Sequence, residues 1–335
     1  MGILISAFKI IFLLGFLIFI HEGGHFLAAK FFKVKVEYFS IGFGPKIWKK
    51  KGKETEYSLS LIPFGGYVKL TGEDEAVDVQ GSFSNCKIWQ RIIIVAAGAI
   101  VNIIFAIIVY FILMFVATQY VSTTVDKIIP EYADKISQIE VGDKILEVNN
   151  HKIRIRSDIA KALRKDRKEK AEILVERNGK EILVEVTPTE YSKYNYVLGA
   201  QMAVIDASLK DKFYYSFWET TNFVTSIGES LKLLVTGNIG MDQMTGPVGI
   251  SEMVVKTSGL YDFIYLLSLI SLSLGVTNLL PIPALDGGKI VLLIIEKIRG
   301  KSLRFETEAG IQTIGFLFLI ILSLYVTYND ILRIF

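Results

Sequence analysis

Four stretches of the chain are nearly free of charge, and each is long enough to form a helix that crosses a membrane. They cover residues 3–20, 92–124, 263–285 and 309–328, and the only charged residue in them is Lys9. A helix rises about 1.5 Å per residue, so about 20 apolar residues span about 30 Å of hydrocarbon. This pattern predicts an α-helical multi-pass membrane protein with four transmembrane helices.

The region after the second apolar run has a different pattern, in which apolar and polar residues alternate. Two such runs are joined by Asn178-Gly179, the pair that a tight β-hairpin turn favours. The stretch SDIAKALRKD predicts a helix with Ser157 as its N-cap. We therefore expect a small α/β domain here. In the segment between the first two runs, residues 64–68 (FGGYV) predict a turn followed by a strand.

The periodicity divides the chain into seven parts. They are a first transmembrane helix at 1–30, a loop with a β-hairpin at 31–91, a second transmembrane helix at 92–121, an α/β domain at 122–190, an amphipathic linker at 191–260, a third transmembrane helix at 261–286 and a fourth at 309–329. The first run is long and no A-x-A-like site precedes the histidines that follow it, which favours a membrane span over a cleaved signal peptide.

Composition and charge agree with a membrane protein. Of the 335 residues, 51% are hydrophobic, more than is usual in soluble enzymes. The net charge of +3 is too small to suggest a nucleic-acid partner, and the single Cys86 excludes an internal disulfide. Basic residues near the ends of the spans are concentrated in the segments 31–91 and 287–308, which predicts that both face the cytosol. The α/β domain and both termini are then outside.

Three polar residues at the end of the first run point to metal chemistry. The sequence HEGGH places His21 and His25 four positions apart, so on a helix the two imidazoles lie on one face and can share a metal ion. Glu22 is adjacent and suited to take a proton from a metal-bound water. A fortuitous motif is the alternative, but ionisable groups at membrane depth cost about 2.5–3.5 kcal/mol each, so they persist where they line a functional cavity.

Zinc hydrolases normally use three protein ligands, and Asp286 is the candidate for the third. It ends the third run in the sequence TNLLPIPALDGGK, and the predicted topology brings it to the same cytosolic half of the membrane as the histidines. A carboxylate at a helix end is the alternative interpretation. Pro281 and Pro283 favour the site, because they free backbone groups that lipid cannot satisfy. His151 lies in the external domain, where a surface position is the better interpretation.

The motifs together resemble the site-2 protease family of intramembrane zinc metalloproteases, and within it the bacterial regulator of sigma E protease group with a PDZ domain. The resemblance rests on H-E-x-G-H, N-x-x-P-x-P-x-L-D-G-G, GFGP (42–45), PFGGYVKL (63–70) and GPVGI (246–250), and it runs over nearly the whole chain. It implies a bacterial plasma-membrane protein that binds Zn²⁺ through His21, His25 and Asp286, with Glu22 as the catalytic carboxylate.

The resemblance also implies where a substrate would bind. Asn278 matches an asparagine that engages the substrate backbone; a hydrogen bond between helices is the alternative. Asn102, in the second span, is interpreted as such a packing residue. Gly65, Gly66, Tyr67 and Val68 match a membrane-associated hairpin that pairs with the substrate, and an ordinary cytosolic hairpin is equally compatible with the sequence. The substrate would be a transmembrane segment of another protein, which must unwind before its backbone can pair with a strand.

The external domain resembles a PDZ domain in the order of its elements, although the usual approach to Gly142-Asp143 is missing. Membrane lipid surrounds the spans, and this domain either binds peptide termini or acts as a lid that admits substrates already trimmed outside. The predicted function is an intramembrane zinc endopeptidase of regulated intramembrane proteolysis. The alternative is a non-catalytic scaffold with a structural metal site, in which Glu22 has no role. A metal transporter is disfavoured because the polar residues form one site rather than a path.

Overall fold

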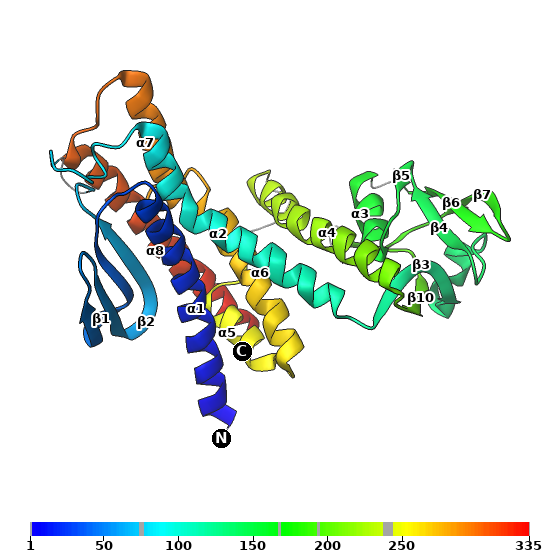
Figure 1. Ribbon diagram of the computed structural model, residues 1–335. Coiled ribbons are helices and arrows are strands. Elements are labelled where there is room, and N and C mark those ends of the chain that lie inside the picture. Colours follow the sequence, from blue (N-terminus) through cyan, green and yellow to red (C-terminus); the bar gives the residue numbers. More distant parts are fainter. Residues whose placement is uncertain (1, 74–76, 167–168, 193–194, 237–243, 335) are drawn as a thin grey trace. The chain divides into compact units, whose positions relative to one another are not determined.

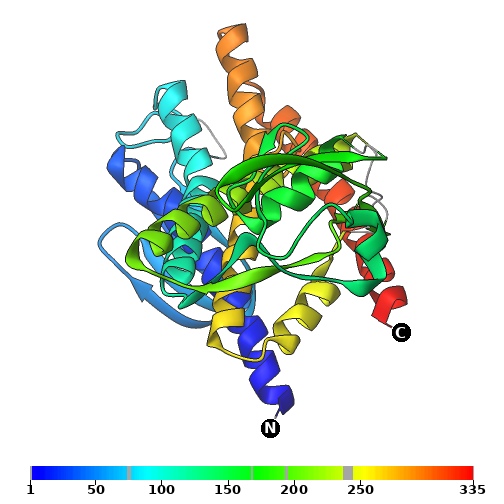
Figure 2. The ribbon, with the colours of Figure 1, turned by 90° about the vertical axis from the view of Figure 1, so that its right-hand side faces the viewer.

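The computed structural model describes residues 2–73, 77–166, 169–192, 195–236 and 244–334. These residues form two compact units, drawn as ribbons in Figures 1 and 2. The helical unit comprises Met1–Tyr110 and Ser226–Phe335, and the central domain comprises Phe111–Thr225. Part of the predicted linker, residues 237–243, lies outside the described residues.

Four helices of the described chain are long and apolar enough to cross a membrane, as predicted. They are α1 (Gly2–Phe31), α2 (Ile88–Phe115), α6 (Leu260–Asn278) and α8 (Phe305–Ile334). The predicted second span of 92–121 is displaced, because α2 begins at Ile88 and ends at Phe115. In α2 an exposed stripe repeats every four residues, at Ile100, Ile104, Ile108 and Ile112. A spacing of four places these side chains on one face, where lipid can cover them.

The third predicted span is shorter than the apolar run that suggested it. Helix α6 ends at Asn278, and Asp286 is the first residue of another helix, α7 (Asp286–Arg299), which occupies the segment predicted as a loop. The prediction that Asp286 ends the span is therefore wrong. Pro281 and Pro283 explain the break, since a proline in a helix removes a hydrogen bond and clashes with the preceding turn.

Two glycines allow the segment between α6 and α7 to fold back on the first turn of α7. A Cβ atom on Gly287 would lie 2.2 Å from the carbonyl oxygen of Leu280, and one on Gly288 would lie 2.3 Å from that of Ile282. Any larger residue at either position would push the segment away. The sequence LDGG therefore places the Asp286 side chain at a helix N-terminus, next to a tightly folded loop.

Strands β1 (Val36–Lys51) and β2 (Glu56–Leu70), which follow α1 in the sequence, form a two-stranded sheet. The register shifts repeatedly: residues 46–51 pair with 56–60, and residues 36–41 pair with 66–70. The predicted turn and strand at 64–68 lie within β2, where Gly65 has a left-handed φ of 84°. Both strands contact α1, so the sheet packs beside the helix that carries the histidines.

The remaining helix of this unit is α5 (Pro247–Lys256), which packs against α1, α6 and α8. Its N-terminus has no side-chain cap of its own. Asp330 of α8 takes that place: its Oδ2 accepts a hydrogen bond of 2.8 Å from the backbone N–H of Gly249. A carboxylate at a helix N-terminus satisfies an unpaired donor and complements the helix dipole. The sequence GPVGI thus begins a helix that is anchored by the C-terminal helix.

The central domain consists of antiparallel strands, a helix against the sheet, and a long helix, α4 (Leu209–Val235), most of which belongs to this unit. The six-stranded sheet has the order β10-β3-β4-β6-β7, with β5 paired to β4. The elements of the domain before α4 are β3 (Gln119–Ile128), η1 (Pro130–Ile136), β4 (Lys144–Val148), β5 (His151–Lys152), α3 (Arg156–Asp166), β6 (Ala171–Arg177), β7 (Lys180–Val186), β8 (Thr189–Ser192), β9 (Asn195–Val197) and β10 (Ala200–Asp206). Strands β8 and β9 form a separate two-stranded sheet.

The hairpin and the helix predicted for this domain both form, and the capping residue of the helix differs from the prediction. The hairpin β6–β7 turns at Asn178-Gly179, both with positive φ, as a type I′ turn requires. Helix α3 forms, but Asp158 rather than Ser157 binds the backbone before it, through the N–H groups of Arg154 and Ile155. Strand β10 pairs with β3, so the sheet extends beyond the predicted domain end at residue 190.

Candidate metal centre

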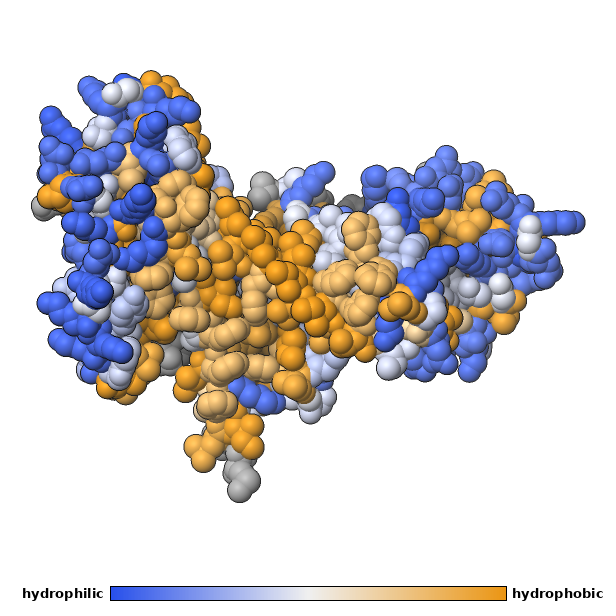
Figure 3. All heavy atoms as spheres, viewed as in Figure 1, coloured by the Kyte–Doolittle hydropathy of each residue, from blue (hydrophilic) through white to orange (hydrophobic). Residues whose placement is uncertain are grey.

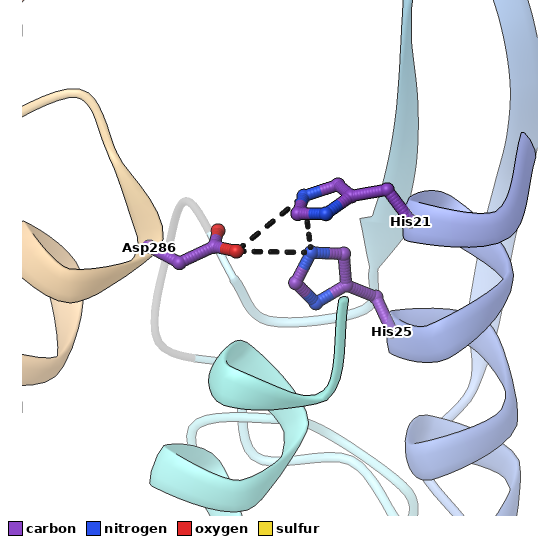
Figure 4. A group of neighbouring side chains, drawn as sticks. All are labelled: His21, His25 and Asp286. Carbon is purple, nitrogen blue, oxygen red and sulfur yellow. Dashed lines mark hydrogen bonds and ion pairs between the residues drawn. The ribbon is translucent and has the colours of Figure 1, made fainter. Parts of the chain in front are cut away.

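Three side chains from two distant segments meet in the helical unit. His21 and His25 project from α1 one turn apart, and Asp286 reaches toward them from the first residue of α7 (Figure 4). The two Nε2 atoms lie 3.2 Å apart, and Asp286 Oδ2 lies 3.4 Å from the Nε2 of His21 and 3.5 Å from that of His25. The ligand set predicted from the sequence is thus brought together by the fold, on one face of α1.

These distances fit a tetrahedral metal ion. Zinc binds imidazole nitrogen and carboxylate oxygen at about 2.0–2.2 Å, and two ligands of a tetrahedron at that distance lie about 3.3–3.6 Å from each other. The three measured separations are at or close to this value. Asp286 Oδ2 is buried and has no hydrogen-bond partner among the described residues. A buried carboxylate oxygen without a donor is costly, and a dication would compensate for it.

The ring of His25 is already oriented for coordination. Its Nδ1 lies 2.9 Å from the backbone carbonyl oxygen of Ile94 in α2, so Nδ1 carries the proton and donates it to that oxygen. The lone pair is then on Nε2, which faces His21 and Asp286. Metal-binding histidines are commonly held in this way by a backbone carbonyl.

Glycines allow α1 and α2 to approach closely at the histidines. A Cβ atom on Gly98 would lie 2.3 Å from His25 Nε2, and one on Gly24 would lie 2.5 Å from the carbonyl oxygen of Ala97. The HEGGH motif therefore has a second role, because one of its glycines makes room for the neighbouring helix. The role of Gly98 was not predicted, although small residues in AAGA are the usual signal of close helix packing.

A cavity of about 230 Å³ opens at the three residues. It is lined by His21, Glu22, His25, Gly66, Tyr67, Val68, Leu70, Glu73, Ile94, Val95, Asp286 and Lys289. Glu22 shares this cavity with the histidines and with residues 66–68 of β2. A Cβ atom on Gly66 would lie 3.0 Å from Glu22 Cγ, so the strand can approach this close because residue 66 is glycine.

Predicted substrate-binding residues are only partly found at this cavity. Gly66, Tyr67 and Val68 line it, whereas Gly65 and Asn278 are not among its lining residues. Asn278 is the last residue of α6 and is half-buried. Its role remains a prediction.

Two polar contacts around the three candidate ligands were not predicted. Lys289 forms an ion pair with Glu73, which connects α7 to the segment after β2. Asn102 lies 3.4 Å from His21 Nδ1, although the sequence suggested only a packing role for it. Glu296, on the same helix as Asp286, is paired with Arg91 at 2.8 Å and lies apart from the cluster. No short sequence motif joins any of these three pairs, whose members are 216, 81 and 205 positions apart.

Comparison with known proteins agrees with the arrangement of the site. The profile of peptidase family M50 matches residues 9–322, nearly the whole chain. The chain belongs to peptidase family M50, the site-2 protease family. The matched region contains all three residues of the cluster, the whole of α2 and α6, and most of α1 and α8.

Relatives within the M50 family are similar over their full lengths. The regulator of sigma-W protease RasP of Bacillus subtilis is 30% identical over 99% of each chain, and the zinc metalloprotease RasP of Bacillus licheniformis is also 30% identical over 99% of each. A protein of Clostridium acetobutylicum whose name assigns it to the zinc metalloproteases is 36% identical, over 95% of this chain and 94% of its own. This M50 peptidase is therefore a zinc-dependent protease.

Proposed function

We propose that this chain is an intramembrane endopeptidase in which His21, His25 and Asp286 bind the zinc ion and Glu22 is the general base. The observation that carries the proposal is the set of 3.2–3.5 Å separations between three ligand atoms on helices α1 and α7, one of which is apolar enough to cross a membrane. Membership of the M50 family supports it.

The residues around the cavity have different roles in peptide hydrolysis. Bound zinc supplies Lewis-acid chemistry, which acidifies a water molecule and polarises the peptide carbonyl. Glu22 takes the proton from the attacking water and returns it to the departing amine. Glu22 lines the same cavity as His21 and His25, which supports this role. Asp286 adds a negative charge that helps hold a dication among apolar helices.

The substrate is a transmembrane segment of another membrane protein. A helix hides its peptide bonds in its own hydrogen bonds, so the segment must unwind and pair its freed backbone elsewhere. Residues 66–68 of β2 support this role, because they line the cavity and have a strand partner on one side, residues 39–41 of β1. Gly65, which precedes Gly66 in β2, and Asn278, the last residue of α6, complete the proposed substrate contacts.

The variant Glu22→Gln tests the chemistry. It keeps the shape of the side chain and removes the base, so we expect zinc content to stay at the wild-type level and cleavage of a transmembrane substrate panel to fall by about 10²-fold or more. Cleavage near the wild-type rate would contradict the assignment of Glu22. A non-catalytic scaffold would show no cleavage by the wild-type protein either, so wild-type cleavage that is lost in Glu22→Gln separates this proposal from a scaffold.

The proposed orientation in a bacterial plasma membrane places the cavity in the cytosolic half, with the central domain and both termini outside. Cysteines introduced at Lys51 and Gly300 should be shielded from an impermeant thiol reagent in intact cells, and one at Asn178 should be labelled. The native Cys86, in the same segment as Lys51, should be shielded as well. Labelling at Lys51 together with shielding at Asn178 would invert the orientation.

A further inference from the structure

Asn102 is a polar residue in the middle of the apolar helix α2, and its side chain has no contact with solvent. The exposed fraction of the residue is 0%. Its Nδ2 lies 3.4 Å from His21 Nδ1, and its Oδ1 is buried without a partner among the described residues. A buried amide in a transmembrane helix costs free energy unless its hydrogen bonds are made. The position of Asn102 therefore needs an explanation beyond packing.

The chemistry of His21 supplies that explanation. Coordination of a metal through Nε2 uses the lone pair of that nitrogen, so the neutral imidazole must carry its proton on Nδ1. Nδ1–H is a donor, and an amide NH₂ group cannot accept from it. Rotation of the Asn102 amide by about 180° exchanges Oδ1 and Nδ2 without changing the shape of the side chain. Oδ1 then faces Nδ1–H and accepts its hydrogen bond.

We propose that Asn102 is a positioning residue of the zinc site, whose Oδ1 accepts the hydrogen bond of His21 Nδ1–H and so fixes the tautomer and the ring orientation of that ligand. This inference rests on the proposed function, because it requires that His21 binds zinc through Nε2. In this arrangement the Nδ1–H group of each histidine is bound by an acceptor on α2. The backbone carbonyl of Ile94 holds His25 Nδ1 at 2.9 Å, and Asn102, two helical turns further along α2, holds His21 in the same way.

Contacts from α6 hold Asn102 itself in place. The Ser271 hydroxyl donates a hydrogen bond of 2.9 Å to the backbone carbonyl oxygen of Asn102. One turn further along α6, a Cβ atom on Gly275 would lie 2.7 Å from the carbonyl oxygen of Ala99, so glycine lets the two helices approach. The backbone from which the amide extends is therefore fixed by a neighbouring helix, as the support of a metal ligand requires.

One other acceptor lies near His21. The backbone carbonyl of Gly98 is within hydrogen-bonding reach of its ring, but in a regular helix that oxygen already accepts the N–H of residue 102. Variants of Asn102 distinguish the two acceptors, because a carbonyl of the backbone is unaffected by substitution of the side chain.

The test measures zinc affinity of the full-length protein in detergent by competition with a chelator. Removal of a residue that supports a metal ligand typically weakens binding about 10–100-fold, and we expect this for Asn102→Leu, which removes the acceptor. Asn102→Asp keeps an oxygen at the same place and should restore most of the affinity. Ser268→Ala is the matched control. It removes a buried hydroxyl of α6 whose bond is to Tyr265 in its own helix, and it should leave zinc affinity unchanged.

The melting temperature of the zinc-free protein separates positioning from packing. A positioning residue leaves it nearly unchanged in Asn102→Leu while zinc affinity falls. Wild-type zinc affinity in Asn102→Leu overturns the inference, since the Gly98 carbonyl would then suffice. A lowered zinc-free melting temperature with no rescue by Asn102→Asp also overturns it, in favour of packing. His21→Ala is measured beside them: if it keeps full zinc affinity, the proposed ligand set fails rather than the role of Asn102 alone.

Discussion

The central domain and the helical unit differ in the side chains that cover their outer faces. The core of the central domain is aliphatic, and Ile145, Val148 and Ile173 in it are at most 1% exposed. In the helical unit, apolar side chains cover the exposed faces of α1 and α2 (Figure 3), while Asn102 and Asp330 are buried at 0% and 1%.

The difference follows from the solvent of each unit. Water drives apolar side chains inward, whereas lipid does not distinguish an apolar side chain from its own tails. Polar groups in hydrocarbon must instead find partners inside the protein. The comparison therefore implies that substitutions of buried polar residues in the helical unit mainly change function, and substitutions of buried apolar residues in the central domain mainly change stability.

Among the variants that test this difference between the two units, the largest effect is expected for Asp286→Asn. The amide keeps the size of the side chain and removes the charge that helps hold a dication, so zinc content and cleavage should fall together, by about 10-fold or more. Metal analysis of the purified protein and cleavage of a transmembrane substrate measure both. Glu296→Gln is the control on the same helix, because Glu296 is paired with Arg91 and should leave zinc in place. Full zinc content and full cleavage in Asp286→Asn would show that Asp286 is only a carboxylate at a helix end and not a ligand.

In the central domain, the strongest effect on stability is expected for Ile173→Ala. Ile173 is 0% exposed in β6, and removal of three carbons from a packed core typically costs about 2–5 kcal/mol. Hydrogen exchange of the full-length protein should show faster exchange in β4, β6 and β7, while zinc content stays the same. Loss of zinc from this variant at a temperature where the domain remains folded would contradict the expectation that substitutions in this core mainly change stability.

A smaller, pH-dependent effect is expected for Asp143. Hydrogen bonds from the Arg177 guanidinium hold the pKa of this carboxyl below its usual value. Because the pKa is lower in the folded state, the interaction stabilises the domain above the unfolded pKa of about 4 and is lost as the pH falls through the folded pKa. Asp143→Asn should lower the stability at pH 7 and flatten its decline in acid, as followed by hydrogen exchange of β6. An equally steep decline in the variant would assign the acid sensitivity to other carboxyls.

The smallest effect is expected on the outer face of α2. Ile104 is 49% exposed, so Ile104→Ala removes a side chain that lipid can replace and should change stability by less than about 0.5 kcal/mol. Ile104→Lys is the contrasting change, since a lysine in the middle of a transmembrane helix costs about 2.5–3.5 kcal/mol on insertion scales. Membrane insertion and melting in detergent measure the two variants. A tolerated lysine here would show that this face of α2 meets water or protein.

The sequence by itself determined the features that depend on local pattern. Runs of apolar residues predicted four membrane helices, because a helix in lipid must be apolar along its whole length. Asn178-Gly179 predicted a hairpin, because both residues accept the positive φ that the turn requires. The spacing of His21 and His25 predicted two ligands on one face, because it is close to one helical turn. Each of these features is encoded within a few neighbouring residues.

Tertiary structure decided which distant groups meet. Asp286 joins the two histidines across some 260 positions only because α6 stops at Asn278 and the folded loop starts α7 beside α1. Asn102 reaches His21 because glycines bring α1 and α2 together, and β10 completes the central sheet from beyond its predicted end. Hydropathy and periodicity describe how one segment meets its solvent. They carry no information on which helix packs against which, so contacts between segments had to come from packing in three dimensions.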